Sequence, residues 1–210
     1  MKEVFDKYVN EETKLEKWQF ICIFCIITVI SGLIGFIYEF IFYYFNGGMK
    51  EFYMQGGNFL PWINIYAIGA LLIILLTYKY RKKPSLVFTI SFISTGLLEY
   101  FSGFIIYKLG NGLRYWDYNT EILNFGNIGG FVCLRSVLIF GLSALLLMYV
   151  IFPFVIYISK KENKKKLMVI CITLLVIVLF DEFYNLILTK MFNLPSAYDF
   201  YTSFGIKYVE

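Results

Sequence analysis

Ionisable side chains inside long apolar segments are the residues of this sequence best placed to do chemistry. Inserting one at the centre of a membrane span costs about 2.5 to 3.5 kcal/mol, so each is a functional candidate. Four of them are Glu39, Glu99, Arg135 and Asp181. At a helical rise of about 1.5 Å per residue, they project to nearly one level in the outer half of a bilayer core about 30 Å thick, with Glu39 slightly nearer the surface. We therefore predict a polar cluster in which Arg135 pairs with Glu99 or Asp181.

The balance of charge in this cluster suggests two roles. The acidic candidates are Glu39, Glu99, Asp181 and Glu182, and the cation is Arg135. Because acids outnumber the cation, some carboxylates need a proton, water or a substrate. One interpretation is an outward-facing polar cavity that binds a small polar or cationic solute. The alternative is that the charges only join helices through salt bridges.

A polar and aromatic segment between two apolar stretches adds candidates for the mouth of such a cavity. Its core, LRYWDYN, lies between two turns rich in glycine and asparagine. The further candidate substrate-binding residues are Arg114, Trp116, Asp117 and Tyr118. The aromatic rings fit an interfacial belt equally well, whereas Arg114 and Asp117 are harder to explain in that way.

The residue types that are scarce or absent exclude several classes of function. The sequence contains no histidine, which removes the usual general base and the commonest metal ligand. We expect no catalytic residue, no metal site and no cofactor, and we predict that the protein is not an enzyme. The cysteines all lie in apolar segments, and we interpret them as reduced core residues. They are Cys22, Cys25, Cys133 and Cys171.

Membrane helices must position these candidates. Only 16% of the 210 residues are charged and 59% are hydrophobic, whereas soluble domains are roughly 25% charged. The apolar stretches are far longer than buried strands, so we predict an all-α, polytopic transmembrane helix bundle forming one domain, 1–210. Glycines such as Gly32, Gly35, Gly96 and Gly103 offer small faces for close helix contacts. The predicted spans are about five, near 18–45, 59–78, 85–109, 128–159 and 167–190.

The orientation of these spans follows from the basic residues between them. Lys and Arg are concentrated in 1–17, 79–84 and 160–166, which the positive-inside rule places in the cytoplasm. The amino terminus is then cytoplasmic and the carboxyl terminus outside. Segment 1–17 is predicted to be amphipathic and 191–210 to form an outer aromatic tail. The basic residues flank spans, so the predicted partner is the lipid bilayer and not nucleic acid.

Several segments together resemble a known family. They are GFIYE, PWINIYAIGA, LLEYFSG, LRYWDYN, VCLRSVLIFG and, last, Asp181. Between about Gly35 and Asp181 the sequence resembles the type IV ABC-transporter permeases, the CmpB-like bacterial membrane proteins. This resemblance implies a permease-like, multi-pass subunit in a bacterial cell membrane.

The chain departs from that family's pattern around the second predicted span. Gln55 stands where the pattern has Arg, and Leu60 replaces the Gly before Pro61. Asn64 and Ala67 replace a Pro and a Gly. Phe131 stands near another expected Arg. The sequence is therefore a divergent member, for which a shared membrane fold is a safer inference than a shared substrate.

Three functions compete on this evidence. The first is the membrane subunit of a transporter, with a separate ATPase because the chain has no Walker A motif. The inner loops of 6 or 7 residues leave little room for a coupling helix. The second is a non-catalytic membrane partner or sensor of another membrane protein. The third is a membrane enzyme acting on lipid, with Arg114 or Arg135 as an anion clamp.

Reporter fusions at the two termini test the predicted topology. With an odd number of crossings, the amino-terminal fusion reports the cytoplasm and the carboxyl-terminal fusion reports the outside. Termini on the same side would contradict five spans. The segment to re-examine would then be 128–159, which Pro153 could divide.

Overall fold

The computed structural model describes residues 8, 15–46 and 51–209. Its regular secondary structure is helical apart from two three-residue strands. Within that part of the chain, four helices are long and apolar enough to cross a membrane, which agrees with the predicted all-α, multi-span class. They are Lys17–Phe45, Pro84–Leu109, Leu134–Lys161 and Lys164–Phe192.

The elements divide between two compact units. The first unit is Met1–Glu16 with Gly69–Lys160, and the second is Lys17–Ile68 with Lys161–Glu210. The elements in chain order are α2 (Lys17–Asn46), β1 (Tyr53–Gln55), α3 (Asn64–Thr77), η1 (Tyr78–Tyr80), α4 (Pro84–Leu109), α5 (Leu134–Leu146), η2 (Leu147–Ile151), α6 (Phe152–Lys161), α7 (Lys164–Phe183), η3 (Tyr184–Leu188), α8 (Thr189–Phe192), α9 (Ala197–Ser203) and β2 (Lys207–Val209). The single-domain organisation stays a prediction.

The second predicted span, 59–78, is corrected. Its helix α3 begins only at Asn64, and Asn64–Tyr80 is a shorter apolar helix than the four candidate spans. The chain before it is irregular because Gly56 and Gly57 take positive φ angles of 92° and 77°, and because Pro61 disfavours helix in the residue before it. Residues 56–63, which lead into α3, are therefore non-helical.

The fourth predicted span, 128–159, is also corrected at its start. Residues 128–133 belong to a loop in which Gly129 and Gly130 have positive φ, and the helix begins at Leu134. Pro153 does not divide the rest of the span. Because proline lacks an N–H, the helix passes through a π-helical turn, η2, and then continues as α6 to Lys161.

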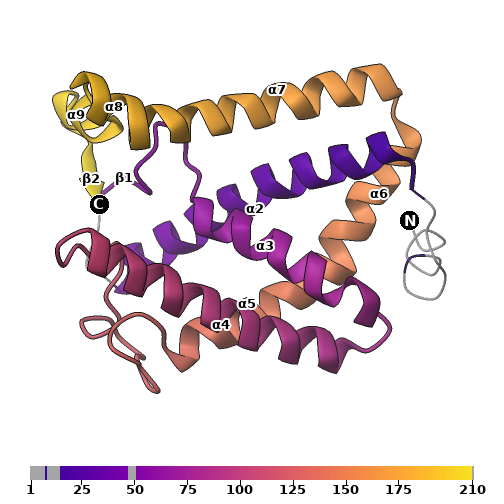
Figure 1. Cartoon of the computed structure of the whole chain (residues 1–210), viewed down its shortest axis with the longest axis horizontal. Helices are drawn as coiled ribbons and strands as arrows, with labels where there is room; N and C mark the ends of the chain where they lie inside the picture. The colour runs from indigo at the N-terminus through magenta and orange to yellow at the C-terminus, as the bar shows by residue number, and fades with distance from the viewer. Residues whose placement is uncertain (1–7, 9–14, 47–50, 210) are drawn as a thin grey trace. The chain divides into compact units, whose positions relative to one another are not determined.

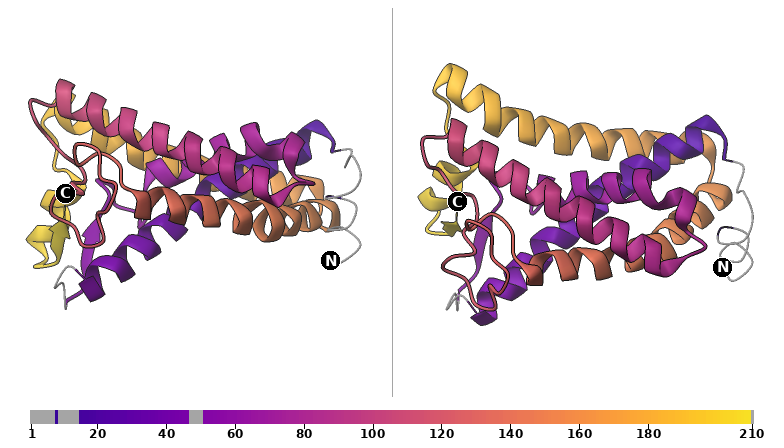
Figure 2. Two further views of the ribbon diagram at one scale, coloured as in Figure 1. Left: turned by 90° about the horizontal axis from the view of Figure 1, so that it is seen from below. Right: turned by 60° about the horizontal axis from the view of Figure 1, so that its bottom comes forward.

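In the first unit, α4 and α5 run side by side (Figures 1 and 2). A Cβ on Gly96 of α4 would lie 2.8 Å from Val137 of α5, so the glycine permits this close approach. The predicted amphipathic segment 1–17 lies largely outside the described residues. Within it, Tyr8 is fully buried against Phe152 and Tyr78.

In the second unit, α2 packs against α7 (Figure 1). Gly32 and Gly35 of α2 leave room for the rings of Trp62 and Tyr66, respectively, which confirms their predicted role in close packing. Trp62 also donates from Nε1 to the carbonyl of Thr28, at 3.2 Å. The four cysteines are buried and free, as predicted.

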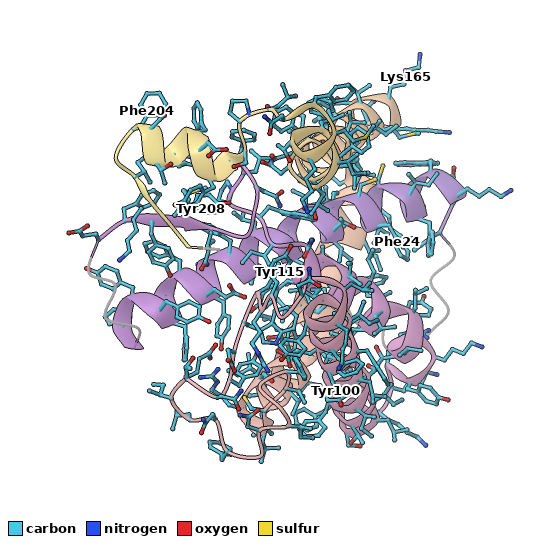
Figure 3. The ribbon with its side chains drawn as sticks, turned by 60° about the vertical axis from the view of Figure 1, so that its left-hand side comes forward. Phe24, Tyr100, Tyr115, Lys165, Phe204 and Tyr208 are labelled. Atoms are coloured by element: carbon cyan, nitrogen blue, oxygen red, sulfur yellow. The ribbon has the colours of Figure 1, made fainter. Side chains whose placement is uncertain are left out.

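The carboxyl-terminal residues, predicted as an aromatic tail over 191–210, form defined structure. Helix α9 is capped at Ser196, and the strand β2 after it pairs in parallel with β1. Tyr208 of β2 lies beneath α9, whereas Phe204 at the end of that helix points away (Figure 3). The tail is therefore folded onto the residues that precede the irregular segment 56–63.

A pair of glycine substitutions tests the packing of α2. In Gly32→Ala the new Cβ would lie 2.1 Å from Trp62 Nε1, so the ring must move and lose its bond to Thr28. We expect this overpacking to cost about 1 to 3 kcal/mol. Gly69→Ala is the control, because its nearest neighbouring atom is 4.0 Å away. Thermal unfolding in detergent measures both, and equal behaviour would contradict the packing.

Candidate functional site

The first polar cluster, in the first unit, is built around Glu99 of α4. This carboxylate is only 6% exposed. Its Oε1 accepts a hydrogen bond from the hydroxyl of Tyr118, and its Oε2 accepts one from Ser136 Oγ at 2.7 Å. Tyr118 comes from the loop 110–133 and Ser136 from the first turn of α5. Glu99 thus joins the loop to both helices of the pair.

Arg135 lies beside this carboxylate and completes the cluster. Its guanidinium forms an ion pair with Glu121 of the loop, and Nη1 donates to the carbonyl of Ile122 at 2.7 Å. Its Cζ lies 5.4 Å from the centre of the Tyr118 ring. The side chains of the ion pair are only 10% and 11% exposed. The ion pair therefore uses a loop carboxylate, whereas the sequence predicted Glu99 or Asp181 as the partner.

The predicted mouth residues hold the loop 110–133 in shape. Arg114 lies 3.5 Å from Asp117 and donates to the carbonyl of Gly129 at 2.9 Å. Trp116 donates from Nε1 to the carbonyl of Phe131 at 2.9 Å. These side chains replace regular secondary structure as partners for the loop's backbone, so they are more than an aromatic belt.

Gly130 is required where these side chains meet. Its φ of +81° disfavours any residue with a Cβ. A Cβ there would also lie 2.3 to 2.4 Å from atoms of Asn119, Arg114 and Asp117. The loop can therefore close over the ends of α4 and α5 only with glycine at this position.

Tyr118 is the loop residue that reaches deepest into the cluster. It is 8% exposed. Burial raises its pKa, and the neighbouring Glu99 carboxylate raises it further. The hydroxyl therefore keeps its proton and remains a donor to Glu99.

The second polar cluster, in the second unit, is built around Asp181 and Glu182 of α7. Asp181, 8% exposed, accepts hydrogen bonds from the backbone N–H groups of Phe59 and Leu60, at 3.0 and 2.7 Å. Glu182 accepts from the side-chain amides of Asn58 and Asn64, at 2.8 and 2.6 Å. Both carboxylates thus bind the irregular segment 56–63, and Glu182 also binds the first residue of α3.

The folded tail supplies the remaining partners of that segment. Tyr201 donates to the carbonyl of Phe59 at 2.6 Å, and Tyr208 donates to the carbonyl of Asn58 at 3.2 Å. Asn185 donates to Asp181 at 2.9 Å and accepts from the backbone of Ala197 at 2.8 Å. The irregular segment is therefore held from α7 and from the tail.

The predicted site residues fall in both compact units. Asp181 and Glu39 belong to the second unit, where Glu39 is half-buried on α2. Burial and the nearby Glu39 carboxylate raise the pKa of Tyr53 to about 12. The residues of the first unit are Glu99, Arg114, Trp116, Asp117, Tyr118 and Arg135.

Several residues of the two clusters were not predicted. Three of them could have been chosen from the sequence, because Ser136 directly follows Arg135, and Asn58 and Asn64 lie on either side of Pro61 at the start of a predicted span. No sequence feature pointed to Glu121, because it follows a polar stretch of an irregular loop. Among the described residues, no group of three His, Cys, Asp or Glu side chains could hold a metal ion.

Comparison with known proteins identifies the family. Residues 18–186 match the model of the family described as "Putative ABC-transporter type IV". The chain belongs to this family. It is a membrane protein of an ABC-transporter family, and its four candidate spans make it multi-pass. No curated protein and no solved structure matched the chain.

A double-mutant cycle tests the ion pair of the first cluster. Arg135→Leu leaves Glu121 without its guanidinium, and we expect a loss of about 3 to 5 kcal/mol in unfolding free energy. Adding Glu121→Gln should recover part of that loss, and adding Glu99→Gln should recover less. Unfolding in detergent measures the cycle, with exposed Lys108→Leu as the control. Strictly additive costs for Arg135 and Glu121 would contradict the pair.

Proposed function

We propose that this chain is the permease-like membrane subunit of a transporter that takes up a small polar or cationic solute from the outer side. The observation that carries the proposal is that carboxylates on the candidate spans bind irregular chain. In each unit a carboxylate on a long apolar helix binds an irregular segment, the loop 110–133 or the segment 56–63. Transporters commonly combine interrupted spans with such charges at their binding sites.

The charges of the second cluster favour a cationic solute. In the part of the chain that the structure describes, neither Asp181 nor Glu182 forms an ion pair, and N–H groups alone bind them. Two adjacent negative charges would attract a cation to this side of the protein.

The proposed topology keeps five crossings in a bacterial cell membrane. Asn64–Tyr80 serves as the helical part of the second crossing, and residues 56–63 complete it as non-helical chain. Such backbone is tolerated at membrane depth where protein groups satisfy it. The basic segments 1–17, 79–84 and 160–166 then all lie in the cytoplasm, and the carboxyl terminus lies outside.

A separate ATPase subunit is the partner that the family's description suggests. The connections available to it are short. Only Arg81–Lys83 separates η1 from α4, and only Glu162 and Asn163 separate α6 from α7. These short turns favour, as the second candidate, a non-catalytic partner or sensor of another membrane protein. We propose no enzymatic activity for either candidate function.

Solute binding and uptake by the purified protein test the proposal. We expect a polar or cationic solute to raise the unfolding temperature of the wild type, since a ligand at 100 times its Kd adds about 2.7 kcal/mol. Glu182→Gln should weaken this effect, whereas Glu162→Gln, an exposed carboxylate between α6 and α7, should not. Liposomes containing the wild type, with ATP and any ATPase that copurifies with it, should take up that solute faster than empty ones. Absence of binding and uptake, together with a stable partner other than an ATPase, would favour the sensor.

A further inference from the structure

Glu99 is a buried ionisable group of the first unit, and its neighbours can form hydrogen bonds with both its ionised and its protonated form. Within the described residues its hydrogen-bond donors are two hydroxyls, those of Tyr118 and Ser136. The guanidinium of Arg135 donates instead to Glu121 and to a loop carbonyl. A carboxylate inside an apolar helix is thus bound directly by neutral partners.

The hydroxyl of Ser136 has two acceptors for its single proton. Its Oγ lies 2.7 Å from Glu99 Oε2 and 2.8 Å from the backbone carbonyl of Cys133. When Glu99 is ionised, Ser136 donates to it. When Glu99 carries a proton on Oε2, that O–H can donate to Ser136 Oγ, and the hydroxyl turns toward Cys133. Both states satisfy every polar atom of the pair without moving heavier atoms.

Protonation of Glu99 changes the net charge of the cluster. The titratable and charged groups that act on it are Arg135 of α5 and, from the loop, Tyr118 and Glu121. Glu99 and Glu121 both ionised against Arg135 leave one excess negative charge, which a proton on Glu99 removes. The 3-10 turn η1 also packs on α4, but three residues separate it from Pro84, which lies about 22 Å along the helix from Glu99.

We propose that Glu99 is a proton-binding site, and that the solute transport proposed above is coupled to its protonation. The proton comes from water, binds Glu99 Oε2, and returns to water as the Ser136 hydroxyl turns back. Tyr118 donates to Oε1 throughout, so the loop stays attached while the charge beneath it changes. The coupling rests on the proposed function, whereas proton binding does not.

Infrared spectroscopy of the purified protein tests proton binding without any solute. Between about pH 9 and about pH 5, a carboxylic-acid carbonyl band should appear in the wild type and be absent in Glu99→Gln. Ser136→Ala removes a bond from both forms of Glu99, but the bond to the ionised form is the stronger one, so half-protonation should occur at higher pH, corresponding to about tenfold tighter proton binding. Ser94→Ala is the matched control, because that hydroxyl bonds only to the backbone of its own helix.

The outcomes separate this inference from the proposed transport. A band that persists in Glu99→Gln, or a titration that Ser136→Ala leaves unchanged, overturns the proton site even if solute is taken up. If Glu99→Gln fails to fold, the comparison of Ser136→Ala with Ser94→Ala still decides. In liposomes, uptake by the wild type should depend on an imposed pH gradient. Uptake that is equally gradient-dependent in Glu99→Gln overturns the coupling alone.

Discussion

The structure depends on one constraint, that polar backbone groups buried away from water must find partners within the protein. Helices meet it by themselves, but residues 56–63 are not helical. Asp181 receives two of their N–H groups, and Tyr201 and Tyr208 donate to two of their carbonyls. Asp181, which the sequence suggested as a partner for Arg135, therefore binds irregular backbone instead.

The first unit meets the same constraint with different groups. Its loop 110–133 is held by Arg114, Trp116 and Asp117, and it is anchored between α4 and α5 through Tyr118. The ion pair of Arg135 with Glu121 adds a second anchor. In both units, then, the charges that are expensive to insert are the ones that fasten non-helical chain to the helices.

This use of charge supports the transport that we propose. A proton or cation that reached these carboxylates would change the hydrogen bonds that hold the irregular segments. Membership of an ABC-transporter family agrees with such a role. The brief turn between α6 and α7 leaves little of the chain for contact with an ATPase.

The sequence by itself determined the membrane class, the family and the limits of three long helices. Lengths and apolar runs suffice for these, and α2, α4 and α7 begin within three residues of the predicted starts. Depth counted along the chain also selected Glu99, Arg135 and Asp181. Depth alone could not show which partners each of them binds, because residues at one level can face different neighbours. Only the tertiary structure assigned Glu121 to Arg135 and residues 56–63 to Asp181, since loop carboxylates and unwound backbone have no periodicity from which their contacts follow.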